Sequence, residues 1–204
     1  MKARSSFTKS TILSLLFSIP LAGMAQADWE LKKDEEGIRV FVKDLEGIEF
    51  RAFKGEAELD YSAQEVVMLL QRVDQYPDLF PSTAEARVIK HLNDTSYIHY
   101  SYIDSPWPVS DRDGAYRTTI SQKGSYVEFK LESLPEYVER VEDVVRIQET
   151  SAYWKIRTLG ERKVHLVYEV YSNPGGSLPA WLVNSAAVSQ PFETIQNLHA
   201  LLAR

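Results

Sequence analysis

Between residues 84 and 171 the hydrophobic residues alternate with polar ones, and this pattern constrains the fold more than any other feature of the sequence. The alternation is clearest in residues 126–132 (Tyr-Val-Glu-Phe-Lys-Leu-Glu) and in residues 163–170 (Lys-Val-His-Leu-Val-Tyr-Glu-Val). Such a pattern is typical of strands that bury one face and hydrate the other, as strands of antiparallel sheets do. Turn-forming pairs divide the stretch into hairpins at Asn93-Asp94, Lys123-Gly124 and Leu159-Gly160.

Before this stretch the sequence predicts a hairpin and then short helices. Residues 38–43 and residues 48–59 read as two strands separated by a glycine-containing turn. Residues 62–65 (Ser-Ala-Gln-Glu) form a capping box, and hydrophobic residues follow it at helical spacing as far as Val73. Two prolines limit residues 74–80 to a short helix or loop.

After the last strand the sequence predicts one long helix. Asn173-Pro174-Gly175-Gly176 ends the strand, and Pro179 lies in the opening turn of the helix, where its missing N–H is not needed. A broad hydrophobic stripe predicts that this helix packs on the concave face of the sheet. The stripe consists of Trp181, Val188, Phe192, Ile195 and Leu202, with Leu198 beside it. Together these elements predict an α+β fold, with about nine antiparallel strands curving around the terminal helix.

Residues 1–27 are expected to be an export signal that is cleaved after Ala27. The first nine residues carry three positive charges, residues 12–21 form an apolar run, and Ala25-Gln26-Ala27 is a small-x-small cleavage site. The apolar run is too short to span a bilayer, which needs about 20 residues. The remaining residues 28–204 suit a single domain, and we expect it to be a monomer.

Cysteine content and charge exclude several classes of function. The chain has no cysteine, so disulfides, thiolate zinc sites and cysteine nucleophiles are excluded. An exported chain without disulfides fits a bacterial periplasm. Without residues 1–27, which hold three of the 23 basic residues and none of the 29 acidic ones, the net charge is −9. This charge argues against a nucleic-acid partner and against electrostatic docking on anionic lipid, so any transient membrane contact has to be apolar and local.

Three segments of the sequence carry a family resemblance. The first is Asp28-Trp29-Glu30-Leu31 followed by residues 37–41 (Gly-Ile-Arg-Val-Phe). The second is residues 106–113 (Pro-Trp-Pro-Val-Ser-Asp-Arg-Asp), and the third is residues 173–184 (Asn-Pro-Gly-Gly-Ser-Leu-Pro-Ala-Trp-Leu-Val-Asn). In this order the segments resemble the START family, the steroidogenic-acute-regulatory-related lipid transfer domains. The resemblance extends from Trp29 to Leu202.

The resemblance implies a helix-grip fold of the START and Bet v 1 type. In that family a curved sheet wraps the terminal helix, a tunnel between them holds one lipid or other apolar molecule, and the loop around Pro106-Trp107-Pro108 forms a lid with the helix.

The sequence departs from the family pattern in two places. The N-terminal helix of the family is absent before Trp29, and Pro77 stands near the position of a basic residue in phosphatidylcholine-binding members, which argues against a phosphocholine head group.

Arg112, Asp113 and Trp107 are candidate residues of the lid and its anchor. Adjacent strand residues point to opposite faces, so Arg112 and Asp113 are not expected to pair with each other. Arg112 either lies near a ligand head group or ties the proline-rich loop to the sheet, and we favour the second interpretation. Trp107 either forms a membrane-touching tip or folds inward against the sheet edge.

Five further residues are candidates for the wall of the tunnel. His99, Arg117 and Glu149 lie on strands that should flank it, and the alternative for each is a satisfied or solvated position. Trp181 and Phe192 are expected to face it from the terminal helix. The four histidines have no metal-binding spacing, and the sequence contains no catalytic motif, so we expect no metal or cofactor.

The leading hypothesis is a protein that binds, and transfers, one hydrophobic molecule. The second is a helix-grip enzyme, a cyclase or hydrolase acting on a hydrophobic substrate, because fold alone does not determine function. An enzyme would need an acid–base pair inside the tunnel, for which His99, His165, Glu149 and Glu169 are candidates. The third is an interaction module whose core is filled and leaves no cavity.

Overall fold

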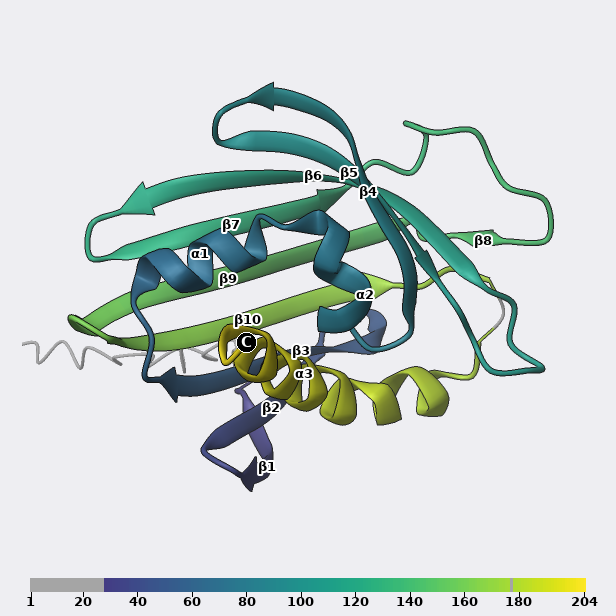
Figure 1. Ribbon diagram of the computed structural model, residues 1–204. Coiled ribbons are helices and arrows are strands. Elements are labelled where there is room, and N and C mark those ends of the chain that lie inside the picture. Colours follow the sequence, from purple (N-terminus) through teal and green to yellow (C-terminus); the bar gives the residue numbers. More distant parts are fainter. Residues whose placement is uncertain (1–27, 177) are drawn as a thin grey trace, which may run out of the picture.

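The structure is a computed structural model that describes residues 28–176 and 178–204, and it contains ten strands and three α-helices (Figure 1). The strands are β1 (Glu30–Glu35), β2 (Ile38–Leu45), β3 (Ile48–Leu59), β4 (Thr83–Asn93), β5 (Ser96–Ile103), β6 (Arg112–Lys123), β7 (Tyr126–Ser133), β8 (Val145–Arg146), β9 (Glu149–Gly160) and β10 (Lys163–Asn173). The helices are α1 (Ala63–Leu70), α2 (Tyr76–Leu79) and α3 (Ala180–Leu202), with a 3₁₀ turn, η1 (Val73–Gln75), before α2.

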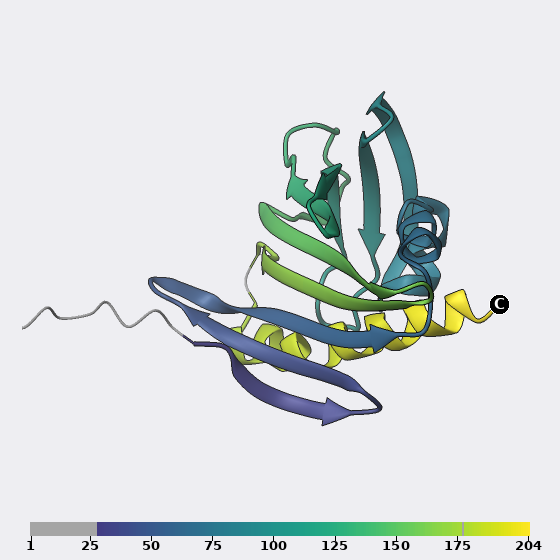
Figure 2. The same cartoon turned by 90° about the vertical axis from the view of Figure 1, so that its left-hand side faces the viewer.

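The strands form one bent sheet in the order β1-β2-β3-β10-β9-β7-β6-β5-β4. Neighbours in this order are antiparallel, whereas the two-residue strand β8 pairs with β6 in parallel. In Figure 1 the three helices lie in front of the sheet, and Figure 2 shows how strongly the sheet bends. The predicted α+β helix-grip architecture is therefore confirmed, and β8 is an addition that the alternation did not reveal.

Local sequence signals account for α1. The hydroxyl of Ser62 accepts a hydrogen bond from the N–H of Glu65 at 3.3 Å, and the carboxylate of Glu65 accepts one from the N–H of Ser62 at 2.7 Å. The predicted capping box is therefore present. These hydrogen bonds with Ser62 lower the pKa of Glu65 below its usual value. Beyond the cap, Val66, Leu69 and Leu70 are buried and attach the helix to the core.

A glycine in β3 lets α3 lie close to the sheet. A β-carbon at Gly55 would lie 2.7 Å from Cδ1 of Ile195 and 3.3 Å from Cβ of Pro191, so a larger residue would push the helix away. Ile195 and Leu198 are fully buried at this contact. The inward stripe predicted for the terminal helix is therefore confirmed in its central part, as is the packing of that helix on the sheet.

The prediction that Trp181 belongs to the inward stripe is wrong, because its side chain is 72% exposed. One turn further along α3, the side-chain oxygen of Asn184 accepts a hydrogen bond from the N–H of Arg51, close to the start of β3. The turn that carries Trp181 therefore lies beside the N-terminal end of β3, and the indole is left largely uncovered. Periodicity gives the direction of a side chain but not the point at which its neighbours end.

Candidate functional site

A cavity of about 170 Å³ lies between α2, the sheet and α3. Aromatic side chains form much of its wall: Phe53, Tyr76, Phe80, Tyr116 and Tyr168. Aliphatic side chains and several hydroxyl and amide side chains also line it, the polar ones being Thr83, Ser101, Thr150, Ser172, Gln190 and Thr194. No lysine, arginine, aspartate or glutamate lines this cavity in the described part of the chain. The presence of the cavity contradicts the hypothesis of a filled core.

His99 reaches the cavity from the middle of β5. Its side chain is 1% exposed and is surrounded by tyrosine rings, with centroid distances of 5.4 Å to Tyr76, 5.8 Å to Tyr97 and 5.3 Å to Tyr116. Its Nδ1 has no hydrogen-bond partner among the described residues. Burial lowers the pKa of His99 to about 3, so the imidazole is neutral at neutral pH.

Two of the three tyrosines beside His99, Tyr76 and Tyr97, have other hydrogen-bond partners. The hydroxyl of Tyr76 donates to the carbonyl of Leu70 at 3.0 Å and lies 3.2 Å from the hydroxyl of Tyr97. Because a hydroxyl has one hydrogen, Tyr97 is the donor in the second contact. Burial raises the pKa of Tyr76 well above its usual value and also raises that of Tyr97, so both hydroxyls stay protonated. Among the described residues of this cluster, Nδ1 of His99 and Oγ1 of Thr118, which pairs with Tyr97 across β5 and β6, are left without a hydrogen-bond partner.

The other tunnel candidates lie elsewhere. Arg117 and Glu149 are exposed, so the solvated alternative is correct for both. Phe192 is buried, but it lies under the ammonium of Lys33, which is 3.6 Å from its ring centroid, and it does not line the cavity. The strand alternation that placed Arg117 near the tunnel did not specify which face of the sheet is concave.

The acid–base pair that an enzyme would need is not assembled in the described residues. His99 lines the cavity, whereas His165 lines a groove on the opposite face of β10. Glu169 alternates with the buried Tyr168 and Val170 and so points the same way as His165. The structure therefore gives His99 no carboxylate partner from the candidates Glu149 and Glu169.

Arg112 and Asp113 do not pair with each other, as expected for adjacent strand residues. Arg112 donates to the carbonyl of Ser110, which agrees with the favoured role in tying the loop to the sheet. Asp113 instead accepts two hydrogen bonds from Arg146, at 2.6 Å and 2.9 Å. Sequence reasoning missed Arg146, although a lone arginine between Val145 and Ile147 is a signal that could have pointed to a buried pair.

Sequence reasoning also missed the polar residues that α3 contributes to the cavity. Gln190 and Thr194 both line it, and Thr194 is fully buried. They are four positions apart and therefore share one face of the helix. Polar residues at this spacing on the inward side of an apolar helix are the signal that could have identified them.

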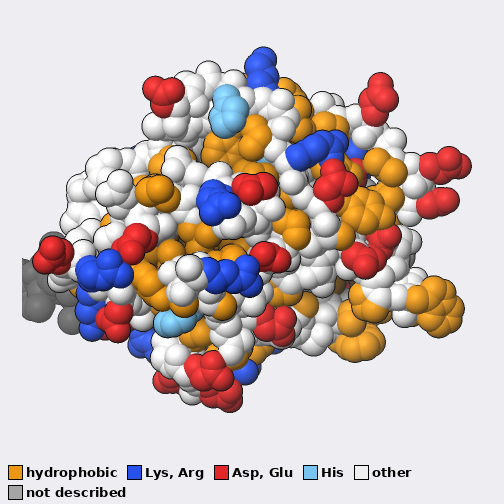
Figure 3. Space-filling view, viewed as in Figure 1, with side chains coloured by type: hydrophobic (Ala, Val, Ile, Leu, Met, Phe, Trp, Pro, Cys, Tyr) orange, Lys and Arg blue, Asp and Glu red, His pale blue; other side chains and the backbone are white. Residues whose placement is uncertain are grey.

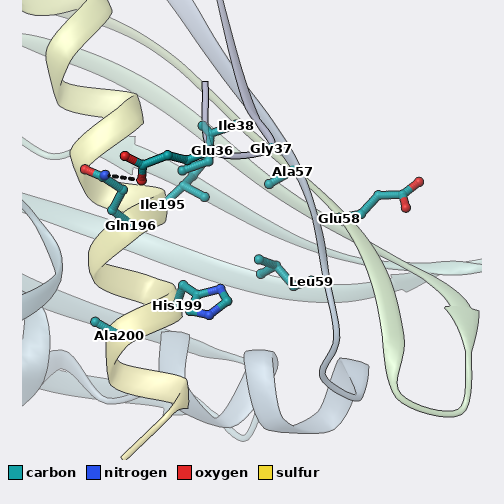
Figure 4. Close-up of a pocket in the computed structure, with 10 residues that line it drawn as sticks. All are labelled: Glu36, Gly37, Ile38, Ala57, Glu58, Leu59, Ile195, Gln196, His199 and Ala200. Atoms are coloured by element: carbon teal, nitrogen blue, oxygen red, sulfur yellow. Dashed lines mark hydrogen bonds between the residues drawn. The ribbon is translucent and has the colours of Figure 1, made fainter. Parts of the chain in front are cut away.

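A second, larger hollow lies outside the tunnel, between the turn after β1, β3 and the C-terminal half of α3 (Figure 4). Its volume is about 320 Å³, and polar or charged residues such as Glu36, Glu58 and His199 stand around a strip of apolar ones. Gln196 donates a hydrogen bond to Glu36 across it at 2.7 Å. Because Glu36 and Glu58 line this groove, whereas no charged residue of the described chain lines the cavity, the cavity is the better candidate for binding a hydrophobic molecule.

Two exposed tryptophans mark one end of the molecule. Trp107 is 93% exposed, so of the two alternatives the inward-folded one is wrong and the projecting tip remains. It belongs to the loop of residues 104–111, which lies at the same end of the molecule as the first turn of α3 with Trp181 (Figure 1). Figure 3 shows hydrophobic side chains projecting from the surface at this end.

Comparison with known proteins identifies the family. No family model matches the chain. The solved structure of a STAR-related lipid transfer protein from Xanthomonas axonopodis is 34% identical to it, with a TM-score of 0.80 and coverage of 86% of this chain and 99% of that one. The chain belongs to the START family. The resemblance carried by the proline-rich loop and the start of the terminal helix is thus confirmed.

Other similar proteins are more distant. An uncharacterized protein of Pseudomonas aeruginosa is 29% identical over 182 residues, covering 88% of this chain and 90% of that protein. The human phosphatidylcholine transfer protein is 23% identical over 194 residues, covering 91% and 88%. An aromatase/cyclase from Streptomyces sp. R1128 shares only the fold, at 16% identity and a TM-score of 0.52 over 75% of this chain and 92% of that one.

Proposed function

We propose that this START protein binds one lipid or other hydrophobic molecule in the cavity beneath α3 and transfers it between membranes. The observation that carries the proposal is an aromatic-walled cavity without a charged lining residue in the described part of the chain. Replacing water around an apolar ligand by such a wall is favourable by about 25 cal/mol per Å² of apolar surface.

The size of the cavity implies that loading involves movement. Pockets that enclose drug-sized ligands have volumes of about 300–1,000 Å³, whereas this cavity measures about 170 Å³. A lipid of ordinary length therefore has to displace part of the wall. We propose that the first turns of α3 and the loop of residues 104–111 are the parts that move, because they lie at the ends of the strands, where Trp107 and Trp181 are exposed.

The same end of the molecule is proposed to touch the membrane. Trp107 and Trp181 project there, and tryptophan is enriched at membrane–water interfaces. A net charge of −9 over residues 28–204 gives no long-range attraction to anionic lipid. Contact would therefore be brief and would depend on the exposed rings. No helix in residues 28–176 and 178–204 is long and apolar enough to cross a bilayer.

Binding is tested by native mass spectrometry of the protein purified from its native host without detergent. The proposal expects a bound species of lipid mass that organic extraction removes, and transfer of a fluorescent lipid between vesicles by the purified protein. Delipidated protein is the control for the mass measurement. Absence of any bound species, together with no transfer above the spontaneous rate, would contradict the proposal.

We further propose that the protein acts in the periplasm as a monomer. The location follows from the predicted signal, whose residues 1–27 lie outside the described residues, and the monomer is the expectation for a single domain of this size. N-terminal sequencing of the native protein should find Asp28, and its mass in solution should be that of one chain. An intact Met1 on cytosolic protein would exclude export, and a stable dimer would exclude the monomer.

A further inference from the structure

We propose that the molecule bound in the cavity carries an uncharged hydroxyl group, which hydrogen-bonds to the imidazole of His99. This inference rests on the proposed function and narrows its ligand to neutral alcohols. It makes His99 the residue that positions the polar end of the ligand.

The first argument is the unpaired state of His99. Its Nδ1 is buried without a partner among the described residues, although three tyrosines surround the ring. The hydroxyl hydrogens of Tyr76 and Tyr97 are already committed to Leu70 and to Tyr76. Buried polar groups in native proteins nearly always have a partner, and a ligand is a partner that the folded chain alone does not supply.

The second argument concerns which polar group fits. Burial keeps His99 neutral, and a neutral imidazole has one nitrogen that donates and one that accepts. A hydroxyl group both donates and accepts, so it can pair with either nitrogen in either tautomer. A carboxylate or phosphate only accepts and would leave an accepting Nδ1 unpaired.

The third argument is the absence of compensating charge. None of the cavity-lining residues in the described part of the chain is charged. The buried ion pair of Asp113 and Arg146 is satisfied within itself, because the guanidinium binds both carboxylate oxygens. Burying a phosphate or carboxylate beside His99 would therefore leave its charge uncompensated, which is strongly unfavourable in an apolar site.

The test uses three pyrene probes of matched size: pyrenebutanol with a hydroxyl, butylpyrene without a polar group, and pyrenebutyrate with a carboxylate. Their dissociation constants are measured by fluorescence on the mature protein at pH 7. The variants are His99→Leu, which removes both nitrogens, and His99→Asn, which keeps a donor and an acceptor. His165→Leu removes an imidazole from the opposite face of β10 and is the matched control. Thermal melts followed by circular dichroism establish that each variant is folded.

The inference expects wild type to prefer pyrenebutanol to pyrenebutyrate by at least about tenfold. It expects His99→Leu to reduce the preference for pyrenebutanol over butylpyrene by about tenfold, or 1.4 kcal/mol. His99→Asn should keep most of that preference, and His165→Leu should keep all of it.

Two results overturn the inference while leaving the proposed function intact. One is an alcohol preference that His99→Leu does not change. The other is that wild type binds pyrenebutyrate as tightly as pyrenebutanol. Because this comparison needs only wild type, it tests the inference even if neither His99 variant folds. If none of the three probes binds to wild type, the proposed function itself fails together with the inference.

Discussion

Asp113 on β6 and Arg146 on β8 form a buried ion pair in which the guanidinium binds both carboxylate oxygens, although 33 positions separate them in the chain. Arg146 also donates to the carbonyls of Pro135, Val138 and Glu139. One side chain therefore holds the long connection between β7 and β8 and attaches it to the sheet beside the parallel pairing of β6 with β8.

Removing the carboxylate of this pair should destabilise the protein severely. Asp113→Ala leaves the Arg146 guanidinium buried without its counter-charge and also removes the acceptor of the Tyr100 hydroxyl. Breaking a buried pair in this way typically costs about 3–5 kcal/mol of unfolding free energy. Urea unfolding measures the loss. Glu136→Ala, which breaks an exposed pair with Arg140, is the control and should change stability by less than about 0.5 kcal/mol. Similar losses of unfolding free energy in both variants would show that the buried pair contributes no more to stability than the exposed pair.

Acid should destabilise the protein through His99. Burial lowers the pKa of His99 to about 3 in the folded state, against about 6.5 in the unfolded chain, so between these values the unfolded state binds more protons. Stability should therefore be complete above about pH 6.5 and fall by up to about 1.4 kcal/mol per pH unit towards pH 3. The measurement compares unfolding free energies of wild type and His99→Asn at several pH values. The variant should lack this part of the slope, and identical slopes would show that His99 is not buried neutral.

The close approach of α3 to β3 predicts a specific rescue. Gly55→Ala places a β-carbon against Cδ1 of Ile195, and overpacking of this kind costs about 1–3 kcal/mol. Ile195→Val removes that atom and alone should cost about 0.5–1.5 kcal/mol. In the double variant the 2.7 Å contact with Cδ1 of Ile195 is gone and only the 3.3 Å contact with Pro191 remains, so its loss of unfolding free energy should be smaller than the sum of the two single losses. If the losses of unfolding free energy in the two single variants simply add up in the double variant, α3 does not lie in close contact with Gly55.

The exposed tryptophans should control the rate of transfer and not the affinity. Trp107→Ser and Trp181→Ser remove rings that touch little of the protein, so the melting temperature should hardly change. Transfer of a fluorescent lipid between vesicles should become slower, because a residue of the lid alters the barrier to exchange. Met68→Ser removes an exposed hydrophobic side chain from α1 and is the control. Unchanged rates in both tryptophan variants would remove this end of the molecule from the mechanism, whereas a large loss of affinity would place the rings in the cavity wall.

Features that depend on neighbouring residues could be predicted from the sequence, and features that depend on distant ones could not. The capping box at Ser62 and the strand of residues 48–59 follow from local spacing and alternation, and both are present in the structure. The exposure of Trp181 depends on where the sheet ends. The pairing of Arg146 depends on a contact across 33 positions, and two-residue β8 is too short to have a period.

Within the candidate site, the sequence identifies His99 as a candidate for the cavity wall, because it is a histidine on a strand that should flank the tunnel. Arg117 and Glu149 were equally conspicuous but lie on exposed positions, because alternation defines two faces of a strand without saying which one is inside. The aromatic wall of the cavity could not be predicted, because its residues do not stand out in the sequence. Tyrosines such as Tyr116 and Tyr168 are common in the cores of sheet proteins and carry no local mark of a cavity.

The way in which α3 packs on the sheet separates the stability of the sheet from the mobility of the helix. The strands are joined by backbone hydrogen bonds, whereas α3 meets them largely through side chains such as Ile195 and through the amide of Asn184. Lifting the first turns of α3 leaves the backbone ladders of the sheet in place. In the proposed loading step α3 moves while the sheet stays intact, so substitutions along its first turns should change the rate of loading without destabilising the sheet.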